Sequence, residues 1–151
     1  MKENSRDNFA RYLNGTESFE NLTPYVDEDR YPDEKTLMYI ETFPVWGGYC
    51  KLMSCITHLW ESMPTAMWET SAIYSKPLEE DFEAEVIALQ YKFATGGWSG
   101  AEDVIYALKS NTLFWTQCWE LSKRGGYFEF KVPNSLGAYN EELREKFTKE
   151  V

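Results

Sequence analysis

The chain has 151 residues, of which 43% are hydrophobic, 26% charged and 17% aromatic, and its formal net charge is −10. This length suits one domain, and the hydrophobic and aromatic content argues against intrinsic disorder. The acidic excess repels phosphate backbones, so it argues against direct nucleic-acid binding and favours a basic protein as partner.

The cysteines and the N-terminal residues bear on the compartment. Cys50, Cys55 and Cys118 give an odd count without the spacing of a disulfide framework, so we expect reduced thiols in a cytoplasm. Residues 2–7 are polar, and no apolar run approaches the roughly 20 residues of a membrane span. We therefore expect neither a secretion signal nor membrane insertion.

The N-terminal part predicts a short helix followed by an acidic connection. Residues 1–6 are expected to be disordered, and a short helix with apolar residues follows them. Residues 16–32 contain two prolines and the run Asp27, Glu28 and Asp29, a composition typical of a solvated acidic loop. A dedicated cation site is the alternative, but no EF-hand spacing follows.

Two helices are predicted in the next segment. Pro32 followed by Asp33 can begin a helix that ends before Pro44. Over residues 49–63 the apolar side chains recur three and four apart, which predicts a buried helix ending before Pro64.

The single histidine of the chain raises the question of a metal site. His58 lies three residues after Cys55 and eight after Cys50, which suggests zinc. A structural zinc site needs four ligands, usually as two close pairs, and Cys118 is the one remaining thiol. We therefore expect these residues to pack rather than to bind a metal, and we assign no cofactor.

Residues 77–94 carry the clearest helical pattern. Pro77 suits a first turn, apolar residues recur three and four apart, and Gly96-Gly97 would end the helix. A solvated helix surface is the simplest role for its first carboxylates, and a partner-binding surface is the alternative. These carboxylates are Glu79, Glu80 and Asp81.

The segment from residue 96 onward combines a helix with a predicted hairpin. Ser99-Gly100-Ala101-Glu102 is a capping box, which predicts a helix ending near Asn111. Aromatic residues alternate over residues 112–122, and Lys123-Arg124-Gly125-Gly126 would turn the chain back into a second strand ending at Val132. A helix over 112–124 is the competing interpretation; the alternation beyond the glycines favours the hairpin.

These elements together predict one α+β domain over residues 1–151. Four to five helices, the last capped by Asn140, would pack on a small antiparallel β-element formed by the hairpin at about 112–132.

Part of this segment resembles a known group of proteins. The run from Gly96 to Glu102, followed by Phe114-Trp115, Trp119 and Arg124-Gly125-Gly126, is similar to a GGWSG…RGG pattern of small uncharacterised proteins of phages and mobile elements. The resemblance implies a genomic setting, that of a phage or mobile element. It implies no reaction. We expect the protein to act in the cytoplasm of a bacterial host cell.

The glycine-rich turn is a candidate ligand site. Glycines and backbone donors before a helix N-terminus can bind an anion, and Trp98, Ser99 and Arg124 would line such a pocket. The turn lacks a P-loop lysine and does not match G-x-G-x-x-G, so a purely structural turn is the alternative. A Ser99 nucleophile would have to recruit His58, and the G-x-S-x-G pattern is incomplete. We assign no catalytic residue and expect no enzyme.

The charge distribution directs the functional hypothesis to surfaces. Residues 1–50 have 5 basic and 10 acidic side chains, and residues 51–100 have 3 and 7. Charge pairing would speed the encounter with a basic groove, while aromatic anchors would supply affinity. The proposed acidic contacts are Asp27, Glu28, Asp29, Glu79, Glu80 and Asp81, and the surplus aromatics next to the acidic face include Trp46, Trp60, Trp68 and Tyr74.

The leading hypothesis is therefore an acidic protein-binding inhibitor. We expect an anti-defence protein of a phage or mobile element, of the anti-CRISPR kind, that occludes or mimics nucleic acid at a basic site of a nucleic-acid-handling effector. The alternatives are an immunity protein against a nuclease toxin, a small ligand- or nucleotide-binding enzyme that uses the Gly96–Glu102 turn, and a structural or assembly protein. The partner's identity and a homodimer are left open.

Overall fold

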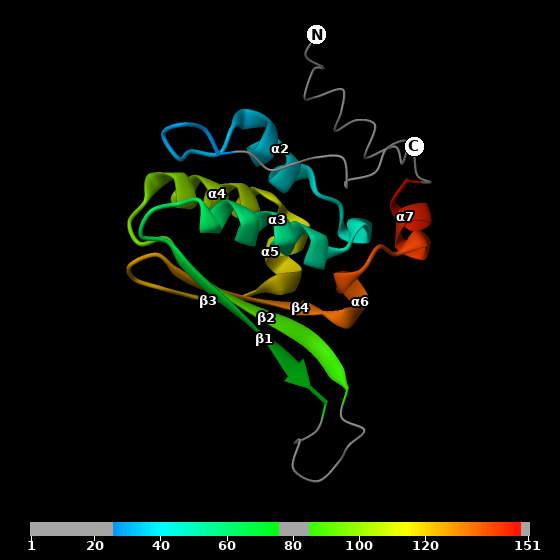
Figure 1. Ribbon diagram of the computed structural model, residues 1–151. Helices are drawn as coiled ribbons and strands as arrows, with labels where there is room; N and C mark the ends of the chain where they lie inside the picture. The colour runs from blue at the N-terminus through cyan, green and yellow to red at the C-terminus, as the bar shows by residue number, and fades with distance from the viewer. Residues whose placement is uncertain (1–25, 76–84, 149–151) are drawn as a thin grey trace.

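Helices cover one face of an antiparallel sheet in the computed structural model, which describes residues 26–75 and 85–148 (Figure 1). Within these residues the sheet has four strands in the order β1-β2-β4-β3. The strands are β1 (Met67–Tyr74), β2 (Val86–Ala94), β3 (Trp119–Lys123) and β4 (Tyr127–Pro133). The predicted α+β class is confirmed, with a sheet larger than the hairpin alone.

The helices begin at several of the predicted signals. Asp33 caps α2, accepting from the Thr36 amide at 2.8 Å, and Asn140 accepts from the Leu143 amide at 3.0 Å. None of the helices in the described residues is long and apolar enough to cross a membrane. The described helices are α2 (Glu34–Thr42), the 3-10 helix η2 (Val45–Gly47), α3 (Tyr49–Glu61), α4 (Ser99–Ser110), α5 (Thr112–Cys118), α6 (Asn134–Gly137) and α7 (Glu141–Thr148).

The predicted helix over residues 77–94 is wrong in its second half, where β2 forms. Residues 77–84 lie outside the described residues, and Val86–Ala94 is a strand. Tyr91 and Phe93 are buried, and the polar Gln90 and Lys92 alternate with them, which is the period of a half-covered strand. β2 also hydrogen-bonds to β1 on one side and β4 on the other, so pairing along both edges overrides the helical spacing.

The predicted hairpin is confirmed from Trp119 onward, but residues 112–118 form helix α5. The hydrogen bonds of the Asn111 side chain explain why a helix forms here instead of a strand. Its Oδ1 accepts from the amide of Phe114 at 3.2 Å, which caps α5, while its Nδ2 donates to the carbonyls of Ile40 at 3.0 Å and Phe43 at 2.9 Å. The buried amide group thus starts a new helix and joins it to the end of α2.

An aromatic core lies between the helices and the covered face of the sheet. Phe93 of β2 packs 5.0 Å from Trp60 of α3 and 6.0 Å from Phe130 of β4, measured between ring centroids. Phe114 of α5 lies 5.4 Å from Phe130 and 5.1 Å from Tyr49. These rings join helices and sheet into one hydrophobic cluster.

Two of the four aromatics proposed as anchors next to the acidic face belong to this core. Trp60 is buried, and its indole nitrogen donates to the carbonyl of Ala94 at 3.0 Å. Trp46 is also buried and packs edge-on against Tyr139. Trp68 and Tyr74 are exposed on β1, as expected.

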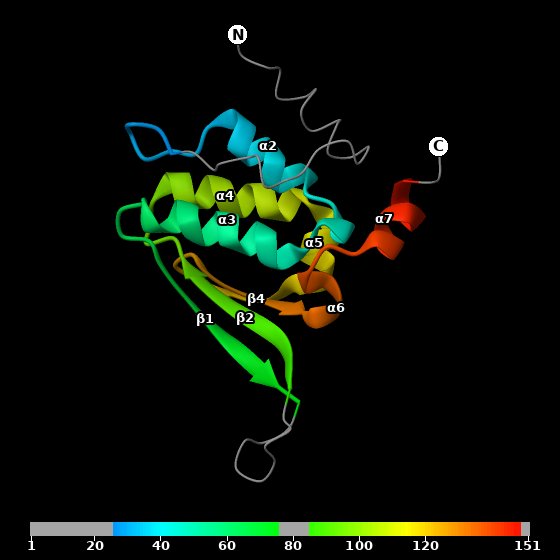
Figure 2. The same ribbon diagram turned by 45° about the vertical axis from the view of Figure 1, so that its right-hand side comes forward.

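The opposite face of the sheet carries no helix in the described part of the chain (Figure 2). In both views β1 and β2 extend together beyond the helical layer. Within the described residues, the fold therefore leaves one sheet face and the β1 edge uncovered.

Candidate functional site

The predicted acidic residues 27–29 form a tight turn. The backbone amide of Asp27 donates to the carbonyl of Tyr31 at 2.8 Å, and a β-bridge joins Val26 to Pro32. Asp27 Oδ1 accepts from the amides of Asp29 at 2.9 Å and Tyr31 at 3.0 Å, so this carboxylate holds the turn together. Glu28 and Asp29 project from the turn and are exposed.

The turn is fastened to the start of α4. The indole nitrogen of Trp98 donates to the carbonyl of Arg30 at 3.0 Å, and the Trp98 ring lies 5.2 Å from that of Tyr31. The hydroxyl groups of Tyr31 and Ser99 are 2.5 Å apart. A Cβ at Gly100 would lie 2.9 Å from the Arg30 carbonyl oxygen, so glycine permits this close approach.

This attachment gathers five exposed carboxylates at one end of the molecule, which we call the acidic end. α2, which follows the turn, packs along α4, and Figure 1 shows the turn beside the start of α4. Both ion pairs of the structure within the described residues lie elsewhere, on β1–β2 and on α7. The acidic end consists of Glu28, Asp29, Glu34, Glu102 and Asp103.

An exposed aromatic lies beside the acidic end. Tyr106 is 71% exposed and follows Glu102 by four residues and Asp103 by three, so the three side chains share the solvent face of α4. Glu79, Glu80 and Asp81 lie outside the described residues.

The glycine-rich turn uses its backbone donors internally. The Gly97 amide donates to Thr95 Oγ1 at 3.3 Å, and the Trp98 amide donates to the Thr95 carbonyl at 3.0 Å. A Cβ at Gly96 would lie 2.0 Å from the carbonyl oxygen of Thr65, so Gly96 is required where the α3–β1 loop crosses the turn. These contacts favour the structural interpretation of the turn over an anion site.

The three predicted pocket residues are placed differently from one another. Trp98 and Ser99 face the acidic turn through the contacts described above, and the capping box is wrong because Trp98 occupies the cap position and Ser99 begins the helix. Arg124 is exposed in the β3–β4 turn, which reaches Thr95 through the Gly126 carbonyl at 2.9 Å. Among the described contacts, none joins Arg124 to Trp98 or Ser99.

The residues considered for zinc do not converge. Burial raises the pKa of the Cys55 and Cys118 thiols to about 12, so both remain protonated at neutral pH, whereas zinc binds thiolate. His58 is exposed on α3. Within residues 26–75 and 85–148, no group of three His, Cys, Asp or Glu side chains could hold a metal ion.

A shallow hollow on the open face of the sheet was not predicted from the sequence. It has a volume of about 320 Å³ and lies where β1, β2 and β4 run side by side. Once β2 is recognised as a strand, the polar residues Gln90 and Lys92, which alternate with Tyr91 and Phe93, would indicate such a face. Its lining residues are Met67, Trp68, Glu69, Lys92, Phe93, Ala94 and Tyr127.

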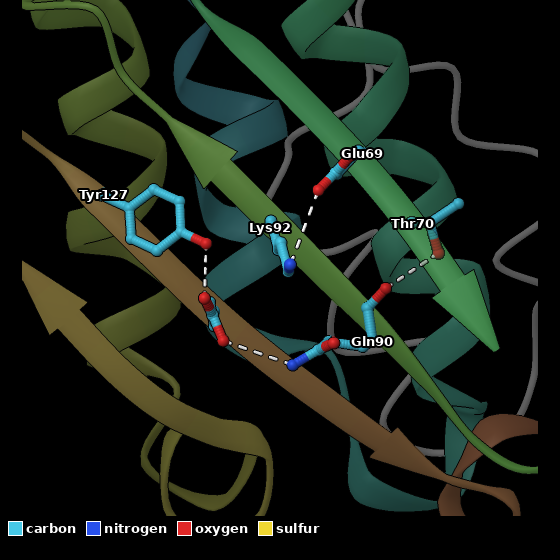
Figure 3. A network of polar contacts seen from close by, with 6 residues as sticks. Glu69, Thr70, Gln90, Lys92 and Tyr127 are labelled. Carbon is cyan, nitrogen blue, oxygen red and sulfur yellow. Dashed lines mark hydrogen bonds and ion pairs between the residues drawn. The ribbon is translucent and has the colours of Figure 1, made fainter. Parts of the chain in front are cut away.

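A polar network crosses this face (Figure 3). Lys92 forms an ion pair with Glu69 at 3.6 Å, Gln90 donates to Glu129 at 3.2 Å, and the Tyr127 hydroxyl donates to the other oxygen of Glu129. The hydrogen bond to Glu129 raises the pKa of Tyr127 to about 12. The amine, the amide and the phenol are thus engaged with carboxylates, so the network stabilises the strand register rather than supplying a free acid or base.

Comparisons with known proteins do not assign the chain to a family. No protein-family model, no curated protein and no solved structure matches it.

Proposed function

We propose that this protein binds a basic surface of another protein through its acidic end, and thereby inhibits a nucleic-acid-handling partner by occlusion or mimicry. The observation that carries the proposal is that carboxylates from three segments of the chain lie together on a fixed scaffold. Charge complementarity speeds encounter with a basic groove. Binding rather than catalysis is the proposed activity.

The ordered turn supports the proposal because it reduces the conformational entropy that is lost on binding. The turn that carries Glu28 and Asp29 is closed by Asp27 and fastened by Trp98, independently of any partner. A loop that is already ordered loses less conformational entropy when it binds. The exposed Tyr106 adds an aromatic anchor of the type that contributes most to interface affinity.

The biological setting is proposed from the resemblance of the Gly96–Glu102 and Arg124–Gly126 segments to proteins of phages and mobile elements. In that setting, the partner is a basic effector of a bacterial defence system, and the protein acts in the host cytoplasm as an anti-defence inhibitor.

The test begins with the tagged protein as bait in nuclease-treated bacterial lysate, eluted by stepwise increases in salt. Association of the partner so identified is then measured with the double variant Glu28→Lys/Asp29→Lys, which leaves Asp27 and the turn intact. We expect slower association and a weaker dependence on salt, because the steering charge is reversed.

The matched control reverses two exposed carboxylates of α7, Glu142→Lys/Glu145→Lys. Each double variant reduces the net charge of −10 by the same four units, to −6. Association of the α7 variant should stay close to that of the native protein. Equal effects of the two variants would show that net charge alone matters, and an unchanged rate in the Glu28/Asp29 variant would overturn the proposal.

A further inference from the structure

The two edges of the sheet differ in how they are protected. β3 is five residues long, carries Glu120 and Lys123, and its register with β4 shifts between Trp119 and Leu121. Short length, charge and irregular pairing are the usual means by which an edge strand avoids pairing with another chain. The β3 edge is therefore protected against pairing with another chain.

β1 lacks most of these protections. It is eight residues long, contains no proline, and has one charged residue, Glu69, which is already paired with Lys92. Its register with β2 is regular from Met67 to Ile73, with a shift just before Tyr74. Within the described residues β1 hydrogen-bonds to β2 alone, so its outer edge presents unpaired backbone groups over most of its length.

β1 also exposes three large side chains that are mainly apolar. Met67 is 71% exposed, Trp68 36% and Tyr74 42%. In Figures 1 and 2 the strand extends beyond the helical layer, so the edge is accessible to another chain. An open edge combined with apolar side chains is the usual signature of a surface that pairs with a further strand.

We propose that β1 pairs antiparallel with β1 of a second copy of this chain, about a two-fold axis at Ser71. An isologous antiparallel pair needs an axis perpendicular to the sheet, which keeps the open faces of both copies on the same side. Residues opposite one another then have numbers that sum to 142. Trp68 lies opposite Tyr74, Glu69 opposite Ile73, and Ser71 opposite Ser71 of the other copy.

The sequence of β1 is self-complementary in this register. The two Trp68–Tyr74 pairs are aromatic cross-strand pairs, which stabilise a sheet, and the small Ser71 residues meet at the axis. Glu69 faces an apolar residue, so no like charges lie opposite each other. Moving the axis to Thr70 or Ala72 would keep the faces aligned but would separate the aromatic pair.

The net charge of −10 on each copy opposes the pairing. Screening weakens this repulsion, so salt should favour the dimer, whereas salt weakens the attraction proposed for the acidic end. The two proposals therefore respond to ionic strength in opposite directions and can fail independently.

The decisive experiment is a charge swap at the axis, followed by analytical ultracentrifugation. Ser71→Lys and Ser71→Glu each place like charges opposite one another, and we expect each variant alone to raise the dimer dissociation constant about fivefold or more. An equimolar mixture of the two should restore dimerisation as a heterodimer. Rescue by mixing also shows that both variants are folded.

The matched controls are Ser122→Lys and Ser122→Glu on the β3 edge, which should dimerise like the native chain. As a second measurement, Ser71→Cys should give a disulfide-linked dimer on mild oxidation and Ser122→Cys should not. A native chain that stays monomeric at about 1 mM protein and about 0.5 M salt, where the repulsion between copies is largely screened, would overturn the proposal. Ser71 variants that dimerise as the native chain does would also overturn it.

Discussion

The two faces of the sheet are formed by the same strands but differ in burial and in the contacts of their side chains. On the covered face, Phe93 and Phe130 are fully buried among aromatic rings of the helices. On the open face, the alternate residues Lys92 and Glu129 belong to a polar network at the surface. Burial makes the covered face the source of stability, and the polar network leaves the open face and the β1 edge available for contacts outside the molecule.

The largest expected difference in stability is between two substitutions in β2, one on each face of the sheet. Phe93→Ala removes a ring packed on Trp60 and Phe130 and should lower the free energy of unfolding by about 3–5 kcal/mol. Lys92→Ala, one residue earlier, breaks an exposed ion pair and should cost less than about 1 kcal/mol. Chemical denaturation measures both, and equal losses would contradict the division between the faces.

A second pair of variants compares a buried side-chain amide with a half-buried one. Asn111→Ala leaves two buried carbonyls and one helix amide without their partner, and should cost about 2–3 kcal/mol. Gln90→Ala on the open face removes one hydrogen bond to Glu129, which water can replace, and should cost about 0.5 kcal/mol. Urea denaturation compares them; a larger loss for Gln90→Ala would show that the open-face network carries stability.

The smallest effect concerns the phenol of the open face. Because the pKa of Tyr127 is raised to about 12 from an ordinary value of 10, its contribution to stability is complete below pH 10 and is lost as the pH rises from 10 to 12. Glu129→Gln removes the accepting carboxylate and should return the pKa towards 10.

Difference titration of tyrosinate absorbance against Tyr127→Phe would isolate this residue from the other tyrosines. The native protein should lose more stability than Tyr127→Phe between pH 10 and 12. A pKa of Tyr127 near 10 in the native protein would show that the hydrogen bond to Glu129 does not form in solution.

Elements with local signals were predicted well. Asp33 and Asn140 mark helix starts, the apolar spacing over residues 49–63 matches α3, and Gly125-Gly126 marks the β3–β4 turn. Each of these signals acts within a few residues of chain, so the sequence shows it directly.

Elements that depend on distant partners were predicted poorly. β2 has a helical spacing that its two neighbouring strands override. Asn111 caps the helix over residues 112–118, and the same side chain is held in place by its bonds to the end of α2. Trp46 and Trp60 were proposed as partner anchors but belong to the core, since hydrophobicity alone does not tell a core aromatic from an anchor.

The candidate site also has one feature that the local sequence predicted and one that depends on a distant contact. The sequence identified Asp27, Glu28 and Asp29 as an acidic loop, from composition alone. Its attachment through Trp98 and the Arg30 carbonyl joins residues 68 positions apart, and a local pattern carries no information about such a contact.

The sequence by itself determined the α+β class, the acidic surface and the helices that begin at their own caps, because these follow from composition and from interactions between near neighbours. The tertiary structure decided which face of β2 is buried, which carboxylates share one end of the molecule and which edge of the sheet stays open. These outcomes depend on hydrogen bonds and packing between segments far apart in the chain, whose free energy appears only when the segments meet.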